Sequence, residues 1–327
     1  MAASILQETR NFLEETPGLS FLWALLRELR PRQWIKNFAL FAGLVFSGLL
    51  DSSGAIQKVF YAFLIFCAAS SATYLLNDVF DIERDRLHPF KSKRPIAAGI
   101  IPAWLAVLLS LGIITIIIPL SYKISTPFFL AVIGYLLLQL AYSSYLKSLI
   151  LIDVMAIAAG FVLRIYAGIW AIDAHLNVWF LLTIVSFALF LAIGKRRSEL
   201  TLLQGAAAKH RETLLHYPEN LLDILTSMFA NSTWLAYAFF TFLQPSVVAR
   251  PRLFFLLDSL SLPFTQAKYL MATIPVVIYG VMRYLYIIYE KKEGESPERV
   301  LLTDRPLLIT VVLWLVMIIG IIYYLGA

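Results

Sequence analysis

The chain has 327 residues, of which 60% are hydrophobic and 15% charged, and its mean hydropathy is +0.78. This composition is too apolar for a soluble globular protein and is typical of a polytopic membrane protein, so the formal net charge of +6 requires no nucleic-acid partner. The single cysteine, Cys67, excludes disulfides within the chain and cysteine-based metal sites, and the four histidines are too scattered for a zinc site.

Residues 1–29 are mixed and amphipathic rather than a cleavable signal peptide, and we expect them to lie at the membrane interface. Nine apolar segments of about the length that a membrane span needs follow. They are 34–50, 57–77, 101–120, 127–143, 149–171, 177–194, 221–243, 270–289 and 306–325. The sequence therefore predicts an all-α, polytopic bundle of nine transmembrane helices over residues 30–327.

Lysine and arginine placement predicts the orientation of this bundle. With the N-terminus in the cytosol, twenty of these residues fall in cytosolic segments and five in segments on the opposite side. This bias follows the positive-inside rule. We therefore expect a multi-pass protein of the plasma membrane whose polar connections, and any active site built from them, face the cytosol.

The segment 30–37 precedes the first apolar run and contains Trp34 and Lys36. Tryptophan is enriched at membrane interfaces, and anchoring alone would explain the segment. Lys36 lies where the helix is expected to begin, and there it would also be able to point inward at a phosphate. The sequence leaves both interpretations open.

The apolar run 59–76 leads directly into the acidic stretch 77–86. On a helix, Asp78, Asp81 and Asp85 have the i, i+3, i+7 spacing that places them on one face. Convergent carboxylates repel one another unless a cation lies among them, and Mg²⁺ accepts a few carboxylate oxygens together with water and substrate phosphates. The alternative is a solvated charge run at the helix end. The repeated acids favour a metal site.

Basic residues follow the acids at once, in the stretch 91–95. Lys91 and Arg94 are suited to hold phosphate oxygens that a metal ion leaves uncovered. The two stretches together predict a metal–phosphate site.

Between the fourth and fifth spans lie Tyr142 and Lys147, and Asp153 and Arg164 follow inside an apolar helix. Ionisable residues at membrane depth usually face a cavity or a partner. Eleven residues, roughly 16 Å along a helix axis, separate Asp153 from Arg164, so each needs a partner on another helix or on a ligand. Buried pairs that hold the bundle together are the alternative to substrate binding.

The sixth span ends in the cationic run that contains Lys195 and Arg196. A positive-inside flank would explain these charges without catalysis. Together with the other clusters expected on the same side, phosphate binding becomes an equally good explanation.

The acidic motif after the second of nine spans resembles that of the UbiA-type intramembrane prenyltransferase superfamily. Further segments resemble its decaprenyl-phosphate phosphoribosyltransferase branch, and the likeness runs from about residue 30 to the end. These segments are 30–37, 85–89, 94–99, 142–147, 160–168, 194–196 and 303–305. One departure from the superfamily supports this branch: a cationic run stands where a second aspartate-rich motif is usual.

This resemblance implies magnesium-dependent transfer of 5-phosphoribosyl from its diphosphate to a polyprenyl phosphate of the bilayer, with release of pyrophosphate. It implies that Mg²⁺ is held by Asp78, Asp81 and Asp85, assisted by Asn77. Lys91 and Arg94 would hold the phosphates of the donor, and Tyr142 would hydrogen-bond a phosphate or a ribose hydroxyl. The candidates for the 5-phosphate or the lipid phosphate, which the sequence does not divide between the two, are Lys36, Lys147, Arg164, Lys195 and Arg196. Asp153 completes the expected substrate-binding residues. The lipid tail would leave through an apolar opening between helices, and a homo-oligomer is compatible with the sequence.

Two alternatives stay open. A UbiA-type prenyltransferase would move a prenyl group from its diphosphate to an aromatic or lipid acceptor, but it favours a second acidic motif. A transporter or flippase would use Asp153 and Arg164 as a midplane site, but it usually shows inverted repeats and broken helices, which this sequence lacks.

Overall fold

The computed structural model describes residues 17–87, 91–202, 217–244, 268–291 and 297–325, and the regular elements in these ranges are all helical. The long helices are α4 (Ser53–Phe80), α6 (Ala103–Ile124), α7 (Thr126–Ser144), α8 (Ile152–Ala171), α9 (Val178–Leu202), α12 (Glu219–Leu243), α14 (Ile274–Tyr286) and α16 (Arg305–Gly320). Short α-helices are α2 (Pro17–Glu28), α3 (Phe41–Phe46), α5 (Ile82–Arg86) and α15 (Pro297–Thr303). Short 3-10 helices are η1 (Pro31–Leu40), η2 (Lys91–Lys93), η3 (Leu146–Ser148) and η4 (Tyr269–Thr273), and π-helical turns are η5 (Ile287–Lys291) and η6 (Ile321–Leu325).

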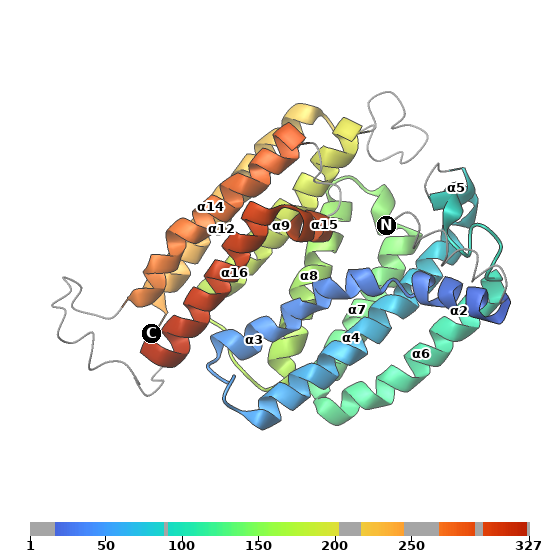
Figure 1. The fold of residues 1–327 in the computed structure, drawn as a ribbon, viewed down its shortest axis with the longest axis horizontal. Coiled ribbons are helices and arrows are strands. Elements are labelled where there is room, and N and C mark those ends of the chain that lie inside the picture. The colour runs from blue at the N-terminus through green and yellow to red at the C-terminus, as the bar shows by residue number, and fades with distance from the viewer. Residues whose placement is uncertain (1–16, 88–90, 203–216, 245–267, 292–296, 326–327) are drawn as a thin grey trace, which may run out of the picture.

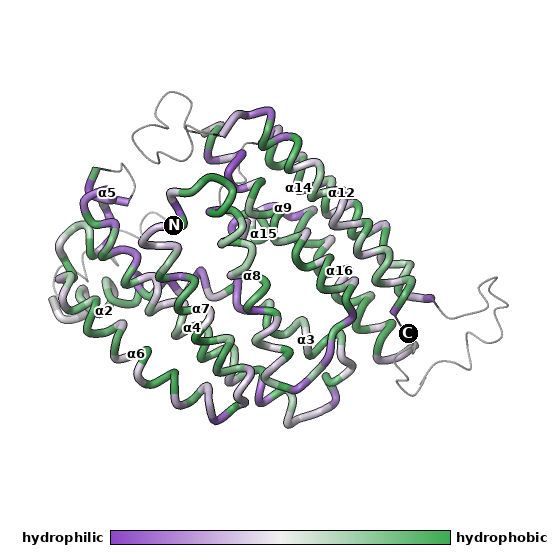
Figure 2. The backbone as a smooth tube through the Cα atoms, turned by 180° about the vertical axis from the view of Figure 1, so that it is seen from behind, coloured by the Kyte–Doolittle hydropathy of each residue, from purple (hydrophilic) through white to green (hydrophobic). Residues whose placement is uncertain are grey.

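Seven helical stretches of the described ranges are long and apolar enough to cross a membrane, so the chain is a multi-pass membrane protein. They are α4, α6, α7, α8, α9 and the stretches Tyr269–Lys291 and Arg305–Tyr324. These agree with seven of the nine predicted spans. Figure 2 shows the hydrophobic colouring that runs along the long helices and the hydrophilic stretch around α5.

The other two predicted spans differ from this pattern. Helix α12 covers the predicted span 221–243, but Asn231, Ser232 and Thr233 at its centre make it less apolar. The predicted span 34–50 is not one regular α-helix, and the structure does not confirm it as a span. The chain instead forms η1 and then the six-residue helix α3, and it turns at Gly48, which has a φ of 73°.

A close backbone contact explains the position of η1. A Cβ atom placed on Gly168 of α8 would lie 1.9 Å from the carbonyl oxygen of Leu40 and 2.6 Å from its carbonyl carbon. Only glycine permits this approach. The α8 backbone therefore lies directly against the end of η1, and Figure 1 shows α8 at the centre of the bundle with α3, α4 and α7 beside it.

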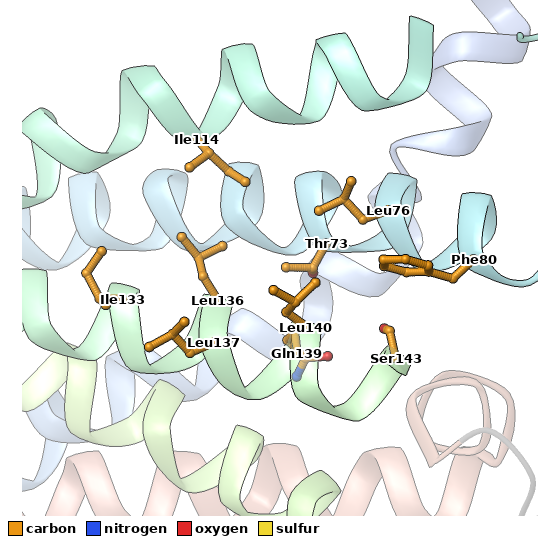
Figure 3. A pocket seen from close by; sticks show the side chains of 10 residues that line it. All are labelled: Thr73, Leu76, Phe80, Ile114, Ile133, Leu136, Leu137, Gln139, Leu140 and Ser143. Carbon is orange, nitrogen blue, oxygen red and sulfur yellow. The ribbon is translucent and has the colours of Figure 1, made fainter. Parts of the chain in front are cut away.

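An apolar groove of about 190 Å³ lies between α4, α6 and α7 (Figure 3). Thr73, Gln139 and Ser143 are its polar lining residues. The apolar ones are Leu76, Phe80, Ile114, Ile133, Leu136, Leu137 and Leu140. The groove runs along α7 and ends at Ser143, at the same end of the bundle as the charged residues described next.

Candidate active site

The acidic stretch lies at a helix break, not on one helix face. Helix α4 ends at Phe80 and α5 begins at Ile82, and Asp81 between them has a φ of −101° and a ψ of 9°. Aspartate is a poor residue for a helix interior, because its short side chain competes for backbone groups. The three acids predicted to converge on one face are divided between two partners: Asp78 and Asp85 share Arg94, and Asp81 pairs with Lys147.

Arg94 joins Asp78 to Asp85. Its Nη1 donates to Asp78 Oδ1 at 3.0 Å and to Asp85 Oδ2 at 2.5 Å. Both carboxylates are buried, and burial raises the pKa of Asp85 although Arg94 and Lys91 oppose this shift. Arg94, which the sequence predicted as a phosphate contact, thus neutralises Asp78 and Asp85.

The sequence interpretation missed two residues of this cluster, Arg30 and Glu28. Arg30 Nη2 donates to both carboxylate oxygens of Asp78, from a left-handed backbone with a φ of 52°. Its guanidinium lies 4.8 Å from the centre of the Tyr74 ring. In the sequence, Arg30 begins the segment 30–37 that resembles the phosphoribosyltransferase branch, but it was given no role in the site, because a cation there is explained by the positive-inside rule.

Glu28, at the end of α2, is 2% exposed. Burial and a hydrogen bond shared with Asp78 raise its pKa to about 8. Its Oε1 has no hydrogen-bond partner among the described residues. An acid in an amphipathic helix is ordinarily solvated, so the sequence carried no signal for this position. We refer to Glu28, Arg30, Asp78, Asp85 and Arg94 as the acid–arginine cluster.

Two contacts extend this cluster toward α7 and η3. Lys147 Nζ lies 2.7 Å from Asp81 Oδ1, and Ser143 Oγ donates to Asn77 Oδ1 at 2.8 Å. Lys147 and Asp81 are thus brought together as a pair, whereas the sequence had assigned one to a phosphate and the other to a metal.

The residue next to Ser143 leads to a second cluster. The Tyr142 hydroxyl accepts from Arg196 Nη2 at 3.1 Å, and Arg196 Nε donates to Asp153 Oδ2 at 2.7 Å. The Tyr217 hydroxyl donates to Asp153 Oδ1 at 2.7 Å. Three predicted residues, Tyr142, Asp153 and Arg196, are therefore in contact. Consecutive residues of α7 connect the two clusters.

Arg164 lies apart from both clusters, deeper in the bundle. Its guanidinium donates to Asn37 Oδ1 at 2.9 Å, to the Gly160 carbonyl at 2.7 Å and to the Tyr135 hydroxyl at 2.8 Å. The expectation that Asp153 and Arg164 find partners on other helices is confirmed.

Three further predicted cations lie nearer to the surface. Lys195 is 33% exposed, and its Nζ lies 3.8 Å from Glu199 Oε1. Lys36 is half-buried beside Asn37, and Lys91 is exposed in η2.

The carboxylate oxygens of the acid–arginine cluster are the kind of atom that a hard divalent cation binds. Within the described ranges, however, no three His, Cys, Asp or Glu side chains approach closely enough to enclose a metal ion. The guanidinium groups of Arg30 and Arg94 lie on the oxygens of Asp78 and Asp85 instead. The chemistry of the ligands fits Mg²⁺, and in this arrangement two arginines supply the positive charge.

The fold and the site define a membrane-embedded helical bundle with paired acids and arginines at one end. The chain belongs to the UbiA prenyltransferase family, whose model matches residues 37–302. It is an enzyme of the transferase class, and the resemblance stated from the sequence is confirmed.

The relatives and structural neighbours agree with this assignment. The chain is 34% identical over 312 residues to a decaprenyl-phosphate phosphoribosyltransferase of Mycolicibacterium smegmatis, covering 94% of this chain and 95% of that protein. It is 32% identical to a protein of that name from Corynebacterium glutamicum, covering 98% and 97%. A solved UbiA homologue of Archaeoglobus fulgidus bound to GPP and Mg²⁺ has a TM-score of 0.68 at 22% identity, over 91% of this chain and 99% of that one. That structure shows the shared fold.

Proposed function

We propose that the enzyme transfers 5-phosphoribosyl from 5-phosphoribosyl diphosphate to a polyprenyl phosphate of the decaprenyl type. The bond from ribose C1 to the diphosphate oxygen breaks, a bond from C1 to an oxygen of the lipid phosphate forms, and pyrophosphate leaves. The lipid phosphate is already anionic at neutral pH, so the reaction requires no dedicated general base. The protein then acts by positioning and by electrostatic preorganisation.

The observation that carries this proposal is the difference between the two halves of the site. Paired acids and arginines surround Asp78, whereas α9 carries the run Lys195, Arg196 and Arg197 in place of a second acidic motif. Asp153 and Asp223 neutralise Arg196 and Arg197, so Lys195, which is 33% exposed beside Glu199, is the cation of this run that a phosphate monoester would meet. The names of relatives at 32% and 34% identity over nearly the whole chain support the same reaction.

The roles of the acidic residues follow from their contacts. Mg²⁺, when held by Asp78, Asp81 and Asp85 with Asn77, would neutralise charge on the leaving diphosphate. Arg94 and Lys91 lie beside these acids and are assigned to the donor phosphates, together with Arg30. Because Arg30 and Arg94 already contact the carboxylates, their charges are in place before a substrate arrives.

Lys36, Lys147 and Lys195 are assigned to the 5-phosphate and the lipid phosphate. Arg164, Arg196 and Asp153 are buried and hydrogen-bonded within the protein, so we assign them to positioning the helices that carry these cations. Tyr142, whose hydroxyl accepts from Arg196, is assigned to a phosphate or a ribose hydroxyl.

The lipid tail would lie against apolar helix surfaces open to the bilayer. The groove between α4, α6 and α7 is one such surface, and it ends at Ser143, the hydrogen-bond partner of Asn77 (Figure 3). We place the protein in the plasma membrane with the N-terminus and the active site on the cytosolic side, on the strength of its lysine and arginine distribution.

The experiment uses the purified full-length protein in lipid nanodiscs. Labelled 5-phosphoribosyl diphosphate is supplied with polyprenyl phosphate, with Mg²⁺ or with a chelator, and the lipid product and pyrophosphate are quantified. We expect Mg²⁺-dependent formation of both in equal amounts. Transfer from a prenyl diphosphate to an aromatic acceptor, with none from the ribosyl donor, would support the prenyltransferase alternative and overturn the proposal.

Variants test the assigned acids. Asp78→Ala and Asp81→Ala should abolish transfer while the protein still inserts and purifies normally. Glu83→Ala is the matched control, because this acid lies in the same stretch and its side chain is 86% exposed. Near-normal turnover in both aspartate variants would refute the metal assignment.

A further inference from the structure

Glu28 has a buried carboxyl oxygen to which no described protein group donates a hydrogen bond. Its side chain is 2% exposed, and Oε1 has no hydrogen-bond partner among the described residues. Ser198 Oγ, another buried side-chain atom in this condition, does not belong to the acid–arginine cluster. Unpaired buried polar atoms are costly and uncommon, so one inside a candidate active site points to a ligand.

The segment that carries Glu28 is fixed on α4. The Leu29 carbonyl accepts from Ser71 Oγ at 2.7 Å, and Trp34 Nε1 donates to the same hydroxyl at 3.0 Å. Glu28 shares a hydrogen bond with Asp78, and the charges of Arg30 and Arg94 act on it. Its free oxygen is therefore held in place beside the residues assigned to the donor diphosphate, as a preorganised contact requires.

Two carboxyl groups that share a hydrogen bond hold one proton between them, so the proton of the Glu28–Asp78 contact does not lie on Oε1. Oε1 has only lone pairs to offer, and its missing partner is therefore a hydrogen-bond donor. Phosphate and diphosphate oxygens at neutral pH are mainly acceptors, and an isoprenoid chain has no donor at all. A pentose offers hydroxyl groups on C2 and C3, next to the carbon that carries the diphosphate. A buried carboxyl group that binds a ribose hydroxyl is a recurrent arrangement in nucleotide-binding proteins.

We propose that Glu28 Oε1 accepts a hydrogen bond from a ribose hydroxyl of the donor, and that Glu28 selects a hydroxylated sugar diphosphate over a prenyl diphosphate. This inference rests on the proposed phosphoribosyl transfer and extends it. It also brings the end of α2 into the active site, beyond the domain boundary at residue 30 that the sequence predicted.

The test compares three donors: 5-phosphoribosyl diphosphate and its 2-deoxy and 3-deoxy analogues. For each donor, kcat/KM is measured with the wild type, Glu28→Ala, Glu28→Gln and the control Arg27→Ala, which alters an exposed neighbour on α2. For the wild type, we expect kcat/KM to be lower by about tenfold or more for one of the deoxy donors, because a site built to bind a hydroxyl group discriminates against an analogue that lacks it. Arg27→Ala should keep this ratio.

In Glu28→Ala, the ratio of kcat/KM for 5-phosphoribosyl diphosphate to kcat/KM for the disfavoured deoxy donor should fall to about one. The variant has no carboxyl group at this position, so the ribose hydroxyl no longer contributes to binding. Glu28→Gln should retain part of it, because the amide oxygen still accepts. A purely structural role would lower kcat/KM for all donors by the same factor and leave the ratio intact, and that result would overturn the inference. A wild type that transfers ribosyl without discriminating either deoxy donor would also overturn it while leaving the proposed function standing. A wild type that transfers no ribosyl group would refute both.

Discussion

Arg196 and Asp153 form an ion pair that is buried on both sides, with Nε 2.7 Å from Oδ2 and side chains that are 1% and 0% exposed. The pair joins the end of α9 to the beginning of α8, and Tyr217 occupies the other carboxylate oxygen. Two charges buried in this way stabilise each other, and their hydrogen bonds help to offset the cost of removing them from water. Arg196 is therefore more than a topogenic flank, and its first role is to hold two helices together at the site.

Replacing Arg196 by Gln should destabilise the protein by about 3 kcal/mol, because the Asp153 carboxylate would remain buried without its counter-charge. The measurement is thermal unfolding of the purified variant in detergent. The double variant Asp153→Asn/Arg196→Gln should recover much of the loss, since it removes the two fully buried charges and leaves only Glu199, whose side chain is 14% exposed, without Arg196. An unfolding temperature of Arg196→Gln equal to that of the wild type would contradict the structural role.

Gly168→Ala should destabilise the bundle by about 3 kcal/mol or more, because the added Cβ would overlap the backbone of Leu40, which has little room to move. Gly112→Ala is the matched control: it lies within α6 and has no atom within 4 Å of the added Cβ. Its replacement should stabilise the helix by up to about 1 kcal/mol. Unfolding temperatures of the two variants in detergent would show the contrast, and equal values would refute the close backbone contact.

Most of the helical architecture could be predicted from the sequence, because a membrane span is specified by about 20 consecutive apolar residues. Seven of the nine predicted spans coincide with long apolar helices. Of the two exceptions, the segment 34–50 could not be predicted, because its 3-10 helix η1 lies against Gly168, more than a hundred residues away. Apolar composition alone does not distinguish a continuous helix from a 3-10 segment.

The candidate site could be predicted in part. Asp78, Asp85 and Arg94 were chosen from the sequence and do meet. The pairing of Asp81 with Lys147 was not predicted, because helix spacing does not say which cation on another element a carboxylate will meet. Glu28 was missed since the burial of an acid depends on what packs over it, and periodicity does not carry that information.

Lys195→Gln should lower kcat/KM by about tenfold, through KM for one of the two phosphorylated substrates, if the ammonium group binds a phosphate. Lys195 is suited to this test because it is 33% exposed, whereas its neighbour Arg196 is buried. The control Arg299→Gln removes an exposed charge from α15. Unchanged kcat/KM for both substrates would remove Lys195 from the site.

The nine-span orientation predicts that Lys93 and Lys123 lie on opposite sides of the membrane. Both are exposed, Lys93 lies before α6, and Lys123 lies in the last turn of α6, whose 22 residues span about 33 Å. The only native cysteine, Cys67, is buried, so the background of labelling is low. A membrane-impermeant thiol reagent should label Lys93→Cys only from the cytosolic side and Lys123→Cys only from the other. Labelling of both from one side would overturn the orientation.

Asp304 predicts a dependence of stability on pH. Its carboxylate accepts from Arg283 Nη2 at 2.9 Å and from Lys291 Nζ at 2.7 Å, and it caps α16 through the Leu307 amide at 3.0 Å. These contacts hold the pKa of Asp304 well below its ordinary value of 3.8. A group whose pKa is lower in the folded state stabilises the protein above its unfolded pKa, and this stabilisation disappears as the pH falls through the folded value.

Asp304→Asn keeps an oxygen that can cap α16 but removes the charge. It should cost about 1 kcal/mol at neutral pH, a modest amount because both cations are partly exposed to solvent. Unfolding temperatures in detergent, measured from pH 7 down to about pH 3, should show the wild type and the variant converging in the acid range, where the carboxylate begins to take up a proton. Asp51→Asn, an exposed acid elsewhere in the chain, should show no such difference at neutral pH. A gap between Asp304→Asn and the wild type that stays constant as the pH falls would mean that the charge of Asp304 does not contribute to stability.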